Sequence, residues 1–201
     1  MRAKFQSTLS GTNNSALVSS TCTQSNPQAP RPNGGIFVID IAKAVSPSSL
    51  AGNVISGSVI ASFASACSPV RAAESPNGSM LWVVARGSNE IISFNVANIL
   101  DNPNAAFVAA TPSGGQAPVG ITFMDGGNKI MVTNSNRFDS DSAPTDANEN
   151  AALFDVSSNG TGTLLQTLAT GLFPRDVSVS PDGSTAAVTS YKSDLITLYH
   201  R

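Results

Sequence analysis

Two arginines in this sequence occupy places where a guanidinium could recognise an anion. Arg71 and Arg175 each follow closely after a proline that opens a run of alternating residues. The planar guanidinium fork matches carboxylate and phosphate groups in a bidentate geometry. Carboxylates also stand nearby, at Glu74 and Asp176, so an ion pair within the protein is the alternative to ligand contact. We therefore take Arg71, Glu74, Arg175 and Asp176 as candidate ligand-binding residues.

An acidic segment lies between positions 135 and 150. It contains Asp139, Asp141, Asp146 and Glu149, and carboxylate oxygens are ligands that calcium prefers. An EF-hand loop needs glycine at its sixth position, and counting from Asp139 places Pro144 there. The spacing therefore favours a solvated acidic loop and predicts no metal site. If a metal did bind, Asp139, Asp141 and Asp146 would be its candidate ligands.

Residues typical of nucleophilic or nucleotide chemistry are scarce. His200 is the only histidine, and general-base work needs an imidazole that neighbouring groups hold in place. We therefore expect no Ser-His-Asp triad. The chain has neither a Walker-type loop nor a G-x-G-x-x-G loop, so nucleotide binding is not expected either. The sequence predicts no cofactor, and its patterns assign no catalytic residue.

Composition narrows the classes of partner. The 201 residues include 11 Lys and Arg against 13 Asp and Glu, with no basic cluster, so nucleic acid is not an expected partner. No run of 18 apolar residues is present, so no membrane span is expected. Charged residues make up only 12%, against about 25% in average proteins, which is typical of extracellular or cell-surface β proteins. The compartment stays open, because the first residues lack the apolar segment of a signal peptide.

Two cysteines, Cys22 and Cys67, allow at most one disulfide. The sequence leaves open whether they pair or remain inert thiols.

The elements that must position these residues repeat along the chain. Pro69, Pro118 and Pro174 each precede a run of alternating residues, a tight turn and a second, aliphatic run. The turns are Ser75-Pro76-Asn77-Gly78, Met124-Asp125-Gly126-Gly127 and Ser180-Pro181-Asp182-Gly183. Period-two runs joined by Pro, Gly, Asn and Asp are typical of antiparallel strands in a meander. The repeat therefore predicts one meander for about every 50 residues.

Four imperfect copies can be counted, with approximate bounds 1–66, 67–115, 116–171 and 172–201. The first copy fits least well, with runs at 5–10, 17–20, 39–41 and 59–63, and the last copy lacks its outer strand. Only residues 42–50 and 97–100 look helical, and both lie in connectors. A single meander cannot bury its apolar face, whereas copies stacked around an axis can. We expect an all-β fold, a β-propeller of about four blades that forms an open arc or a fragment of a seven-bladed ring.

The loops and edges of such an arc indicate where partners would bind. Two long insertions, at 21–33 and 135–150, separate second and third runs, and loops of this kind carry specificity in many folds. We expect a small-molecule or protein ligand on that loop face. An open arc also leaves strand edges and an apolar sheet face uncovered, which predicts self-association.

The repeat resembles a known family. The phrase formed by Pro174-Arg175, Ser180-Pro181-Asp182-Gly183 and Val188-Thr189-Ser190 resembles the YVTN repeat of the lactonase-like seven-bladed β-propellers. Met131-Val132-Thr133-Asn134 stands where that repeat has its naming tetrapeptide. The resemblance covers residues 55–201 best. It implies either a binding or scaffold module, or a lactone hydrolase (6-phosphogluconolactonase-like) or cycloisomerase (carboxymuconate cyclase-like).

Departures from the family pattern favour the binding module. Members of the lactonase branch tend to open one blade with Pro-Arg-His and to carry a glutamate in the turn after its second strand. Here Asp176 stands where the histidine would be, and Tyr191-Lys192 stands where the glutamate would be. The resemblance therefore implies no catalytic set within these 201 residues, and leaves lactone hydrolysis or cycloisomerisation as the alternative function.

Overall fold

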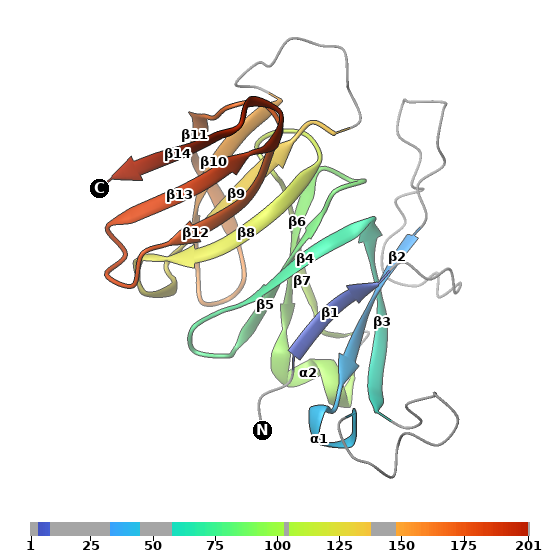
Figure 1. The fold of residues 1–201 in the computed structure, drawn as a ribbon. Helices are drawn as coiled ribbons and strands as arrows, with labels where there is room; N and C mark the ends of the chain where they lie inside the picture. The colour runs from blue at the N-terminus through green and yellow to red at the C-terminus, as the bar shows by residue number, and fades with distance from the viewer. Residues whose placement is uncertain (1–3, 9–32, 45–57, 103–104, 138–147, 201) are drawn as a thin grey trace.

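The computed structural model describes residues 4–8, 33–44, 58–102, 105–137 and 148–200. Within these residues the chain forms four antiparallel sheets that follow one another in sequence order (Figure 1). The two middle sheets have four strands each and the two end sheets have three. In every sheet, strands that are consecutive in the described chain are neighbours, which is the topology of a meander.

The strands have the following bounds. The first sheet contains β1 (Lys4–Thr8), β2 (Asn33–Ile39) and β3 (Val59–Cys67). The second contains β4 (Pro69–Glu74), β5 (Met80–Ala85), β6 (Glu90–Asn95) and β7 (Phe107–Pro112). The third contains β8 (Pro118–Met124), β9 (Lys129–Ser135), β10 (Glu149–Val156) and β11 (Gly162–Ala169). The fourth contains β12 (Pro174–Val179), β13 (Thr185–Ser190) and β14 (Leu195–His200).

Among the described residues, short helical turns connect several of these strands. They are α1 (Ile41–Ala44), α2 (Val96–Asp101), η4 (Asp125–Gly127) and η5 (Tyr191–Ser193). The predicted helix at 97–100 is α2. The one predicted at 42–50 begins as α1, and its remaining residues lie outside the described ranges. None of the helices among the described residues is both long and apolar enough to span a bilayer.

The three prolines of the repeat are structurally equivalent. Pro69, Pro118 and Pro174 are the first residues of β4, β8 and β12, where a missing N–H donor costs nothing. In all three strands the pairing register shifts directly after the proline. The residue before each proline has φ between 51° and 57°. Each inner strand therefore begins with the same kink.

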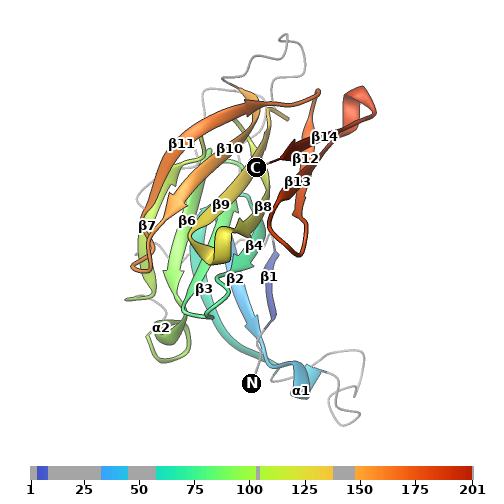
Figure 2. The same cartoon turned by 90° about the vertical axis from the view of Figure 1, so that its left-hand side faces the viewer.

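The apolar cores lie between successive sheets. Between the first and second sheets they include Ile36, Val38, Phe63, Leu81, Val83 and Phe94. Between the second and third they include Trp82, Val84, Ile130, Val132 and Phe154. Between the third and fourth they include Met131, Ala151, Val177, Ala186 and Val188. Figure 2 shows β1, β4, β8 and β12 along one side of the stack and the outer strands β7 and β11 along the other. This arrangement confirms the predicted all-β propeller arc.

The first sheet departs from the predicted template. β1 pairs directly with β2, Phe5 opposite Val38, so no strand lies between the first run of this copy and the run that ends at residue 41. The predicted second run at 17–20 lies outside the described residues. The approximate blade boundaries stay a prediction.

The cysteine question has a partial answer. Cys67, at the end of β3, is disulfide-bonded. Cys22, the other cysteine of the chain, lies outside the described residues.

Candidate functional site

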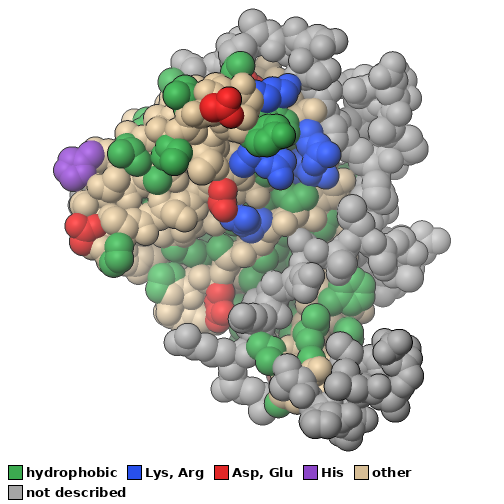
Figure 3. Space-filling view, in the orientation of Figure 1, with side chains coloured by type: hydrophobic (Ala, Val, Ile, Leu, Met, Phe, Trp, Pro, Cys, Tyr) green, Lys and Arg blue, Asp and Glu red, His purple; other side chains and the backbone are tan. Residues whose placement is uncertain are grey.

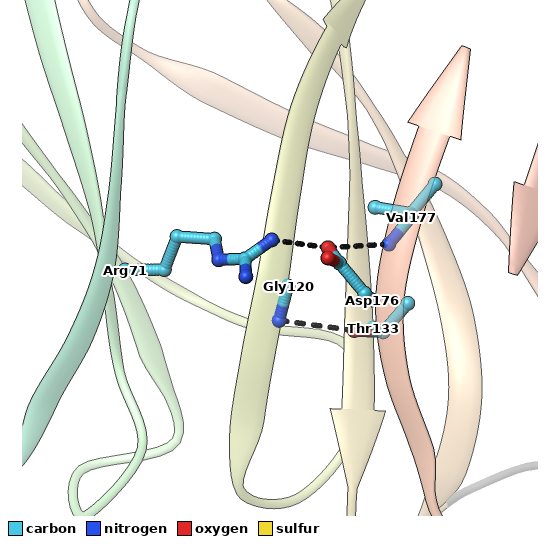
Figure 4. A network of polar contacts seen from close by, with 5 residues as sticks. All are labelled: Arg71, Gly120, Thr133, Asp176 and Val177. Carbon is cyan, nitrogen blue, oxygen red and sulfur yellow. Dashed lines mark hydrogen bonds and ion pairs between the residues drawn. The ribbon is translucent and has the colours of Figure 1, made fainter. Parts of the chain in front are cut away.

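Arg71 and Asp176, both predicted as site residues, meet across the inner strands. Arg71 Nη1 on β4 donates to Asp176 Oδ1 on β12 in an ion pair. Figure 4 shows the two side chains meeting beside β8, which lies between their strands. The same carboxylate oxygen accepts a hydrogen bond of 2.8 Å from the backbone N–H of Val177. Because the side chains are 43% and 44% exposed, we expect the pair to contribute at most about 1 kcal/mol.

Gly120 of β8 makes this contact possible. It lies two residues after Pro118, as Arg71 does after Pro69 and Asp176 after Pro174. A Cβ at position 120 would come within 2.5 Å of Thr133 Oγ1 and 3.2 Å of Asp176 Cα. The hydroxyl of Thr133 instead accepts a 3.0 Å hydrogen bond from the Gly120 N–H. β8 therefore presents no side chain at the place where Arg71 of β4 and Asp176 of β12 meet.

The structure corrects the expected equivalence of Arg71 and Arg175. Arg71 lies opposite Val84 in the sheet, and the residue with the matching position is Asp176, opposite Thr189. Arg175 falls on the register shift directly after Pro174. Its side chain is exposed, and its guanidinium carbon lies 5.4 Å from the centroid of the Phe173 ring. One residue of offset therefore sends the two arginines into different surroundings.

Four residues at the start of β12 and the end of β13 form what we call the loop-end cluster: Phe173, Arg175, Tyr191 and Lys192. Lys192 Nζ lies 5.4 Å from the Phe173 centroid, and the Phe173 and Tyr191 rings lie 6.1 Å apart. Backbone hydrogen bonds from the N–H groups of Tyr191 and Lys192 to the segment before β12 hold the turn in place. Figure 3 shows Lys and Arg side chains gathered on this side of the molecule around a small apolar patch.

The two cations of this cluster, Arg175 and Lys192, form no ion pair among the described residues. Both side chains are exposed, as is Tyr191. Two positive charges therefore share one aromatic ring at the surface.

A cavity of about 380 Å³ opens beside the cluster. Its lining residues are Arg175, Thr189, Ser190, Tyr191, Asp194, Leu195 and Ile196. Pockets of this size accommodate small organic ligands. The cavity therefore combines a guanidinium, a carboxylate, a phenol and an apolar wall.

Glu74, also predicted as a site residue, belongs to neither group. It lies three positions after Arg71 on the same strand, so its side chain points to the opposite face. It is exposed, and no ion pair of Glu74 occurs in the part of the chain that the structure describes.

The acidic loop falls mostly outside the described residues, which exclude Asp139, Asp141 and Asp146. Glu149, at its end, is buried as the first residue of β10. Within the described ranges, no group of three His, Cys, Asp or Glu side chains is arranged to hold a metal ion. His200 is exposed, and its Nδ1 lies 3.1 Å from Thr185 Oγ1.

Sequence reasoning missed four contributors to these sites. Phe173, Tyr191 and Lys192 were not predicted as site residues, because a cluster formed by two turns has no signature in either turn alone. Gly120 was also missed, although aligning the three prolines would have exposed it as the single position with no side chain.

Comparison with known proteins gives one family match. Residues 131–201 match the family model described as lactonase, 7-bladed beta-propeller. No curated protein matches the chain.

Several solved structures share the fold. A candidate 6-phosphogluconolactonase from Bacteroides fragilis has a TM-score of 0.62 at 16% identity, over 89% of this chain and 53% of its own. A protein from Lactobacillus plantarum has a TM-score of 0.58 at 22% sequence identity, and the match covers 86% of this chain and 48% of that protein. A functionally unknown protein from Desulfotomaculum acetoxidans has a TM-score of 0.56 at 18% identity, and the match covers 83% of this chain and 48% of that protein. The chain thus spans about half the length of these proteins, and identities this low speak for the fold alone.

Proposed function

Because the chain is a partial lactonase-like β-propeller, we propose that it is a binding module that takes a small anionic ligand at the loop-end cluster. The ligand class is an organic acid or a phosphate ester small enough for the adjoining cavity of about 380 Å³. The observation that carries the proposal is that two cations, Arg175 and Lys192, lie near the ring of Phe173. Neither of them forms an ion pair with a carboxylate among the described residues.

The physical argument is electrostatic. Two like charges near one ring repel each other, and an anion placed between them removes that repulsion while accepting charge-assisted hydrogen bonds. Arg175 supplies a planar fork for two oxygens, and Lys192 supplies a mobile point charge. Tyr191, whose phenol can donate a hydrogen bond, also lines this cavity.

The ion pair of the inner strands supports a structural role for the other arginine. Arg71 forms an ion pair with Asp176, so its guanidinium is less available to a ligand than that of Arg175. This difference supports placing the ligand at the loop-end cluster instead of at the inner strands.

Binding can be measured by calorimetric titration with 6-phosphogluconate, gluconate and inorganic phosphate, with glucose as the neutral control. A hydrogen bond to a charged group contributes about 1.5–3 kcal/mol. We therefore expect Arg175→Gln and Lys192→Gln each to weaken the binding of the anions about tenfold or more.

The matched control is Lys129→Gln, which removes one positive charge near η4, where Lys129 pairs with Asp125. It should leave anion binding unchanged. The proposal fails if no anion binds saturably, or if Lys129→Gln weakens binding as much as Lys192→Gln does.

Lactone hydrolysis is the second candidate, because Arg175 and Asp194 line the same cavity. A guanidinium could hold the carbonyl oxygen of a lactone while a carboxylate activates water. This function predicts turnover of sugar lactones that Asp194→Asn and Arg175→Ala both abolish. Saturable anion binding without such turnover would favour the binding module.

A further inference from the structure

We propose that Asn77 is a site of intrinsic chemical modification, at which the folded chain converts its own side-chain amide to a carboxylate. The reaction is deamidation, in which the backbone nitrogen of Gly78 attacks Cγ of Asn77 and ammonia leaves. The site lies in the turn between β4 and β5, whereas the loop-end cluster lies at the start of β12 and the end of β13. The inference therefore does not depend on the proposed ligand.

The sequence contains Asn-Gly steps at positions 33–34, 77–78 and 159–160. Glycine has no Cβ, so its backbone nitrogen is the least hindered nucleophile that can follow an asparagine. The first step begins β2, whereas the other two lie in turns between strands. Asn77 and Asn159 are both exposed, so water reaches both side chains.

Three donors hold the carbonyl oxygen of the Asn77 side chain. Oδ1 accepts hydrogen bonds from Ser75 Oγ at 2.7 Å, from the Ser79 backbone N–H at 3.1 Å and from Ser79 Oγ at 2.8 Å. The bond from the Ser79 N–H folds the side chain back over the Gly78 peptide, which carries the attacking nitrogen. When that nitrogen adds to Cγ, negative charge develops on Oδ1, and donors already aimed at the oxygen stabilise this charge.

Water is the only co-reactant that the conversion needs. The Gly78 N–H gives its proton to solvent, its nitrogen bonds to Cγ of Asn77, and the bond from Cγ to Nδ2 breaks as ammonia departs with a proton from solvent. Water then opens the resulting cyclic imide and leaves aspartate or isoaspartate at position 77. The turn gains one negative charge.

The fourth sheet already contains the turn that this reaction would produce. Asp182 holds the position equivalent to Asn77, and its carboxylate accepts hydrogen bonds from Ser180 and Ser184. A carboxylate with a normal backbone at position 77 would meet the same donors from Ser75 and Ser79. The fold therefore accommodates the aspartate product.

Asn159 has similar donors but a more restrained glycine. Its Oδ1 accepts hydrogen bonds of 3.2 Å from the Thr161 N–H and 3.0 Å from Thr161 Oγ1. Gly160, however, is buried, and its carbonyl accepts a 2.6 Å hydrogen bond from Ser93 Oγ on β6 of the neighbouring sheet. This turn is therefore tied to the second sheet through the glycine that would have to move.

Attack also requires the glycine N–H to leave its own hydrogen bond. The N–H groups of Gly78 and Gly160 each donate to the carbonyl three residues before, at 2.8 Å and 3.0 Å. Residues 75–78 are all exposed or half-buried, so local opening frees the Gly78 nitrogen more readily than the buried Gly160 nitrogen. Asn77 should therefore react before Asn159.

The test is incubation of the folded chain in mildly alkaline buffer, followed by peptide mapping with mass spectrometry and detection of isoaspartate. Conversion at position 77 should be faster than at position 159. In urea, which unfolds both turns, the two rates should become similar. Equal rates in the folded chain, faster conversion at 159, or the same ranking in urea would each overturn the proposal, as would an unreactive Asn77.

Ser79→Ala tests the role of the donors, because it removes the hydroxyl bond to Asn77 Oδ1 and keeps the backbone bond. It should slow conversion at position 77 about two- to tenfold, the effect expected from one neutral hydrogen bond. The matched control is Ser184→Ala, which removes the equivalent hydroxyl bond from Asp182 and should leave that rate unchanged. Faster conversion in Ser79→Ala would overturn the proposal, because these bonds would then hold the amide away from attack.

Discussion

The second and fourth sheets of this protein are both antiparallel meanders, but they differ in how much of their surface is buried. All six residues of β5 are buried, because the first and third sheets cover both faces. In β13, the equivalent strand, buried residues alternate with partly or fully exposed ones, because among the described sheets it is the third that packs against it. The sequences already differ accordingly: β5 reads MLWVVA and β13 reads TAAVTS. A strand covered on both faces is apolar throughout, and a strand covered on one face alternates.

The third strand of the fourth sheet breaks this correspondence. β13 presents Thr and Ala on its uncovered face, but β14 presents Ile196 and Leu198 there. On this face, the small and polar side chains of β13 suit exposure to solvent, whereas the large apolar side chains of β14 are typical of a buried surface.

The largest expected effect compares core residues of the two sheets. Trp82→Ala should lower the free energy of unfolding by about 3–5 kcal/mol, because it leaves a large cavity between the second and third sheets. Ile196→Ala in the monomeric chain should change it by about 0.5 kcal/mol or less, since its side chain is mostly exposed. Urea unfolding measures both. Equal losses would show that Ile196 is covered within one chain.

A second prediction concerns the contact between the two sheets over β8. Gly120→Ala should cost about 1–3 kcal/mol, because the new methyl group must displace Thr133 and the backbone of β12. Arg71→Ala should cost at most about 1 kcal/mol, since its ion pair is half-exposed.

A double-mutant cycle between these two positions checks the mechanism. We expect the double variant to lose less than the sum of the single losses, because displacement of β12 already breaks the Arg71–Asp176 pair. Strict additivity would show that the glycine and the ion pair act independently.

Hydrogen exchange should distinguish the sheets residue by residue. Amides of β5 have paired strands on both sides and buried side chains, whereas β14 has a paired neighbour only on the β13 side among the described strands. We expect amides of β14 to exchange at least about tenfold faster than those of β5, through local opening. Protection of β14 that rises with protein concentration would indicate an intermolecular partner.

The smallest expected effect concerns two equivalent turns. In the fourth sheet, hydrogen bonds from the Ser180 hydroxyl and from the backbone and hydroxyl of Ser184 lower the pKa of Asp182 to about 2. In the second sheet, Asn77 Oδ1 accepts the equivalent bonds from Ser75 and Ser79 at 2.7–3.1 Å. The same turn is therefore built once with a carboxylate and once with a neutral amide.

The lowered pKa sets the direction of the pH dependence. The stabilisation from ionised Asp182 is complete above its ordinary pKa of 3.8 and is lost as the pH falls toward about 2. Asp182→Asn should therefore flatten the acid limb of thermal stability between these values, and Asn77→Asp should steepen it. An unchanged acid limb in both variants would contradict this account of the two turns.

Much of the fold follows from local patterns. The prolines, the Asx-Gly turns and the period-two runs each depend on a few adjacent residues, so they predict strands and meanders directly. The first sheet is predicted less well, because its pairing of β1 with β2 joins segments about 30 residues apart with no shared motif. Of the candidate site residues, Arg175 and Asp176 are adjacent in sequence, yet one lies at the surface cluster and the other in an ion pair with Arg71.

Side-chain alternation and local backbone preference are enough to predict the strands, their turns and the need to stack one meander on the next. Which charges meet depends on how the sheets pack. The register shift after Pro174 and the bare backbone at Gly120 bring Arg71 to Asp176 and leave Arg175 beside Phe173. Such contacts change when the pairing register shifts by one residue, and they join strands that are far apart in the chain. A pattern of adjacent residues does not show such a shift.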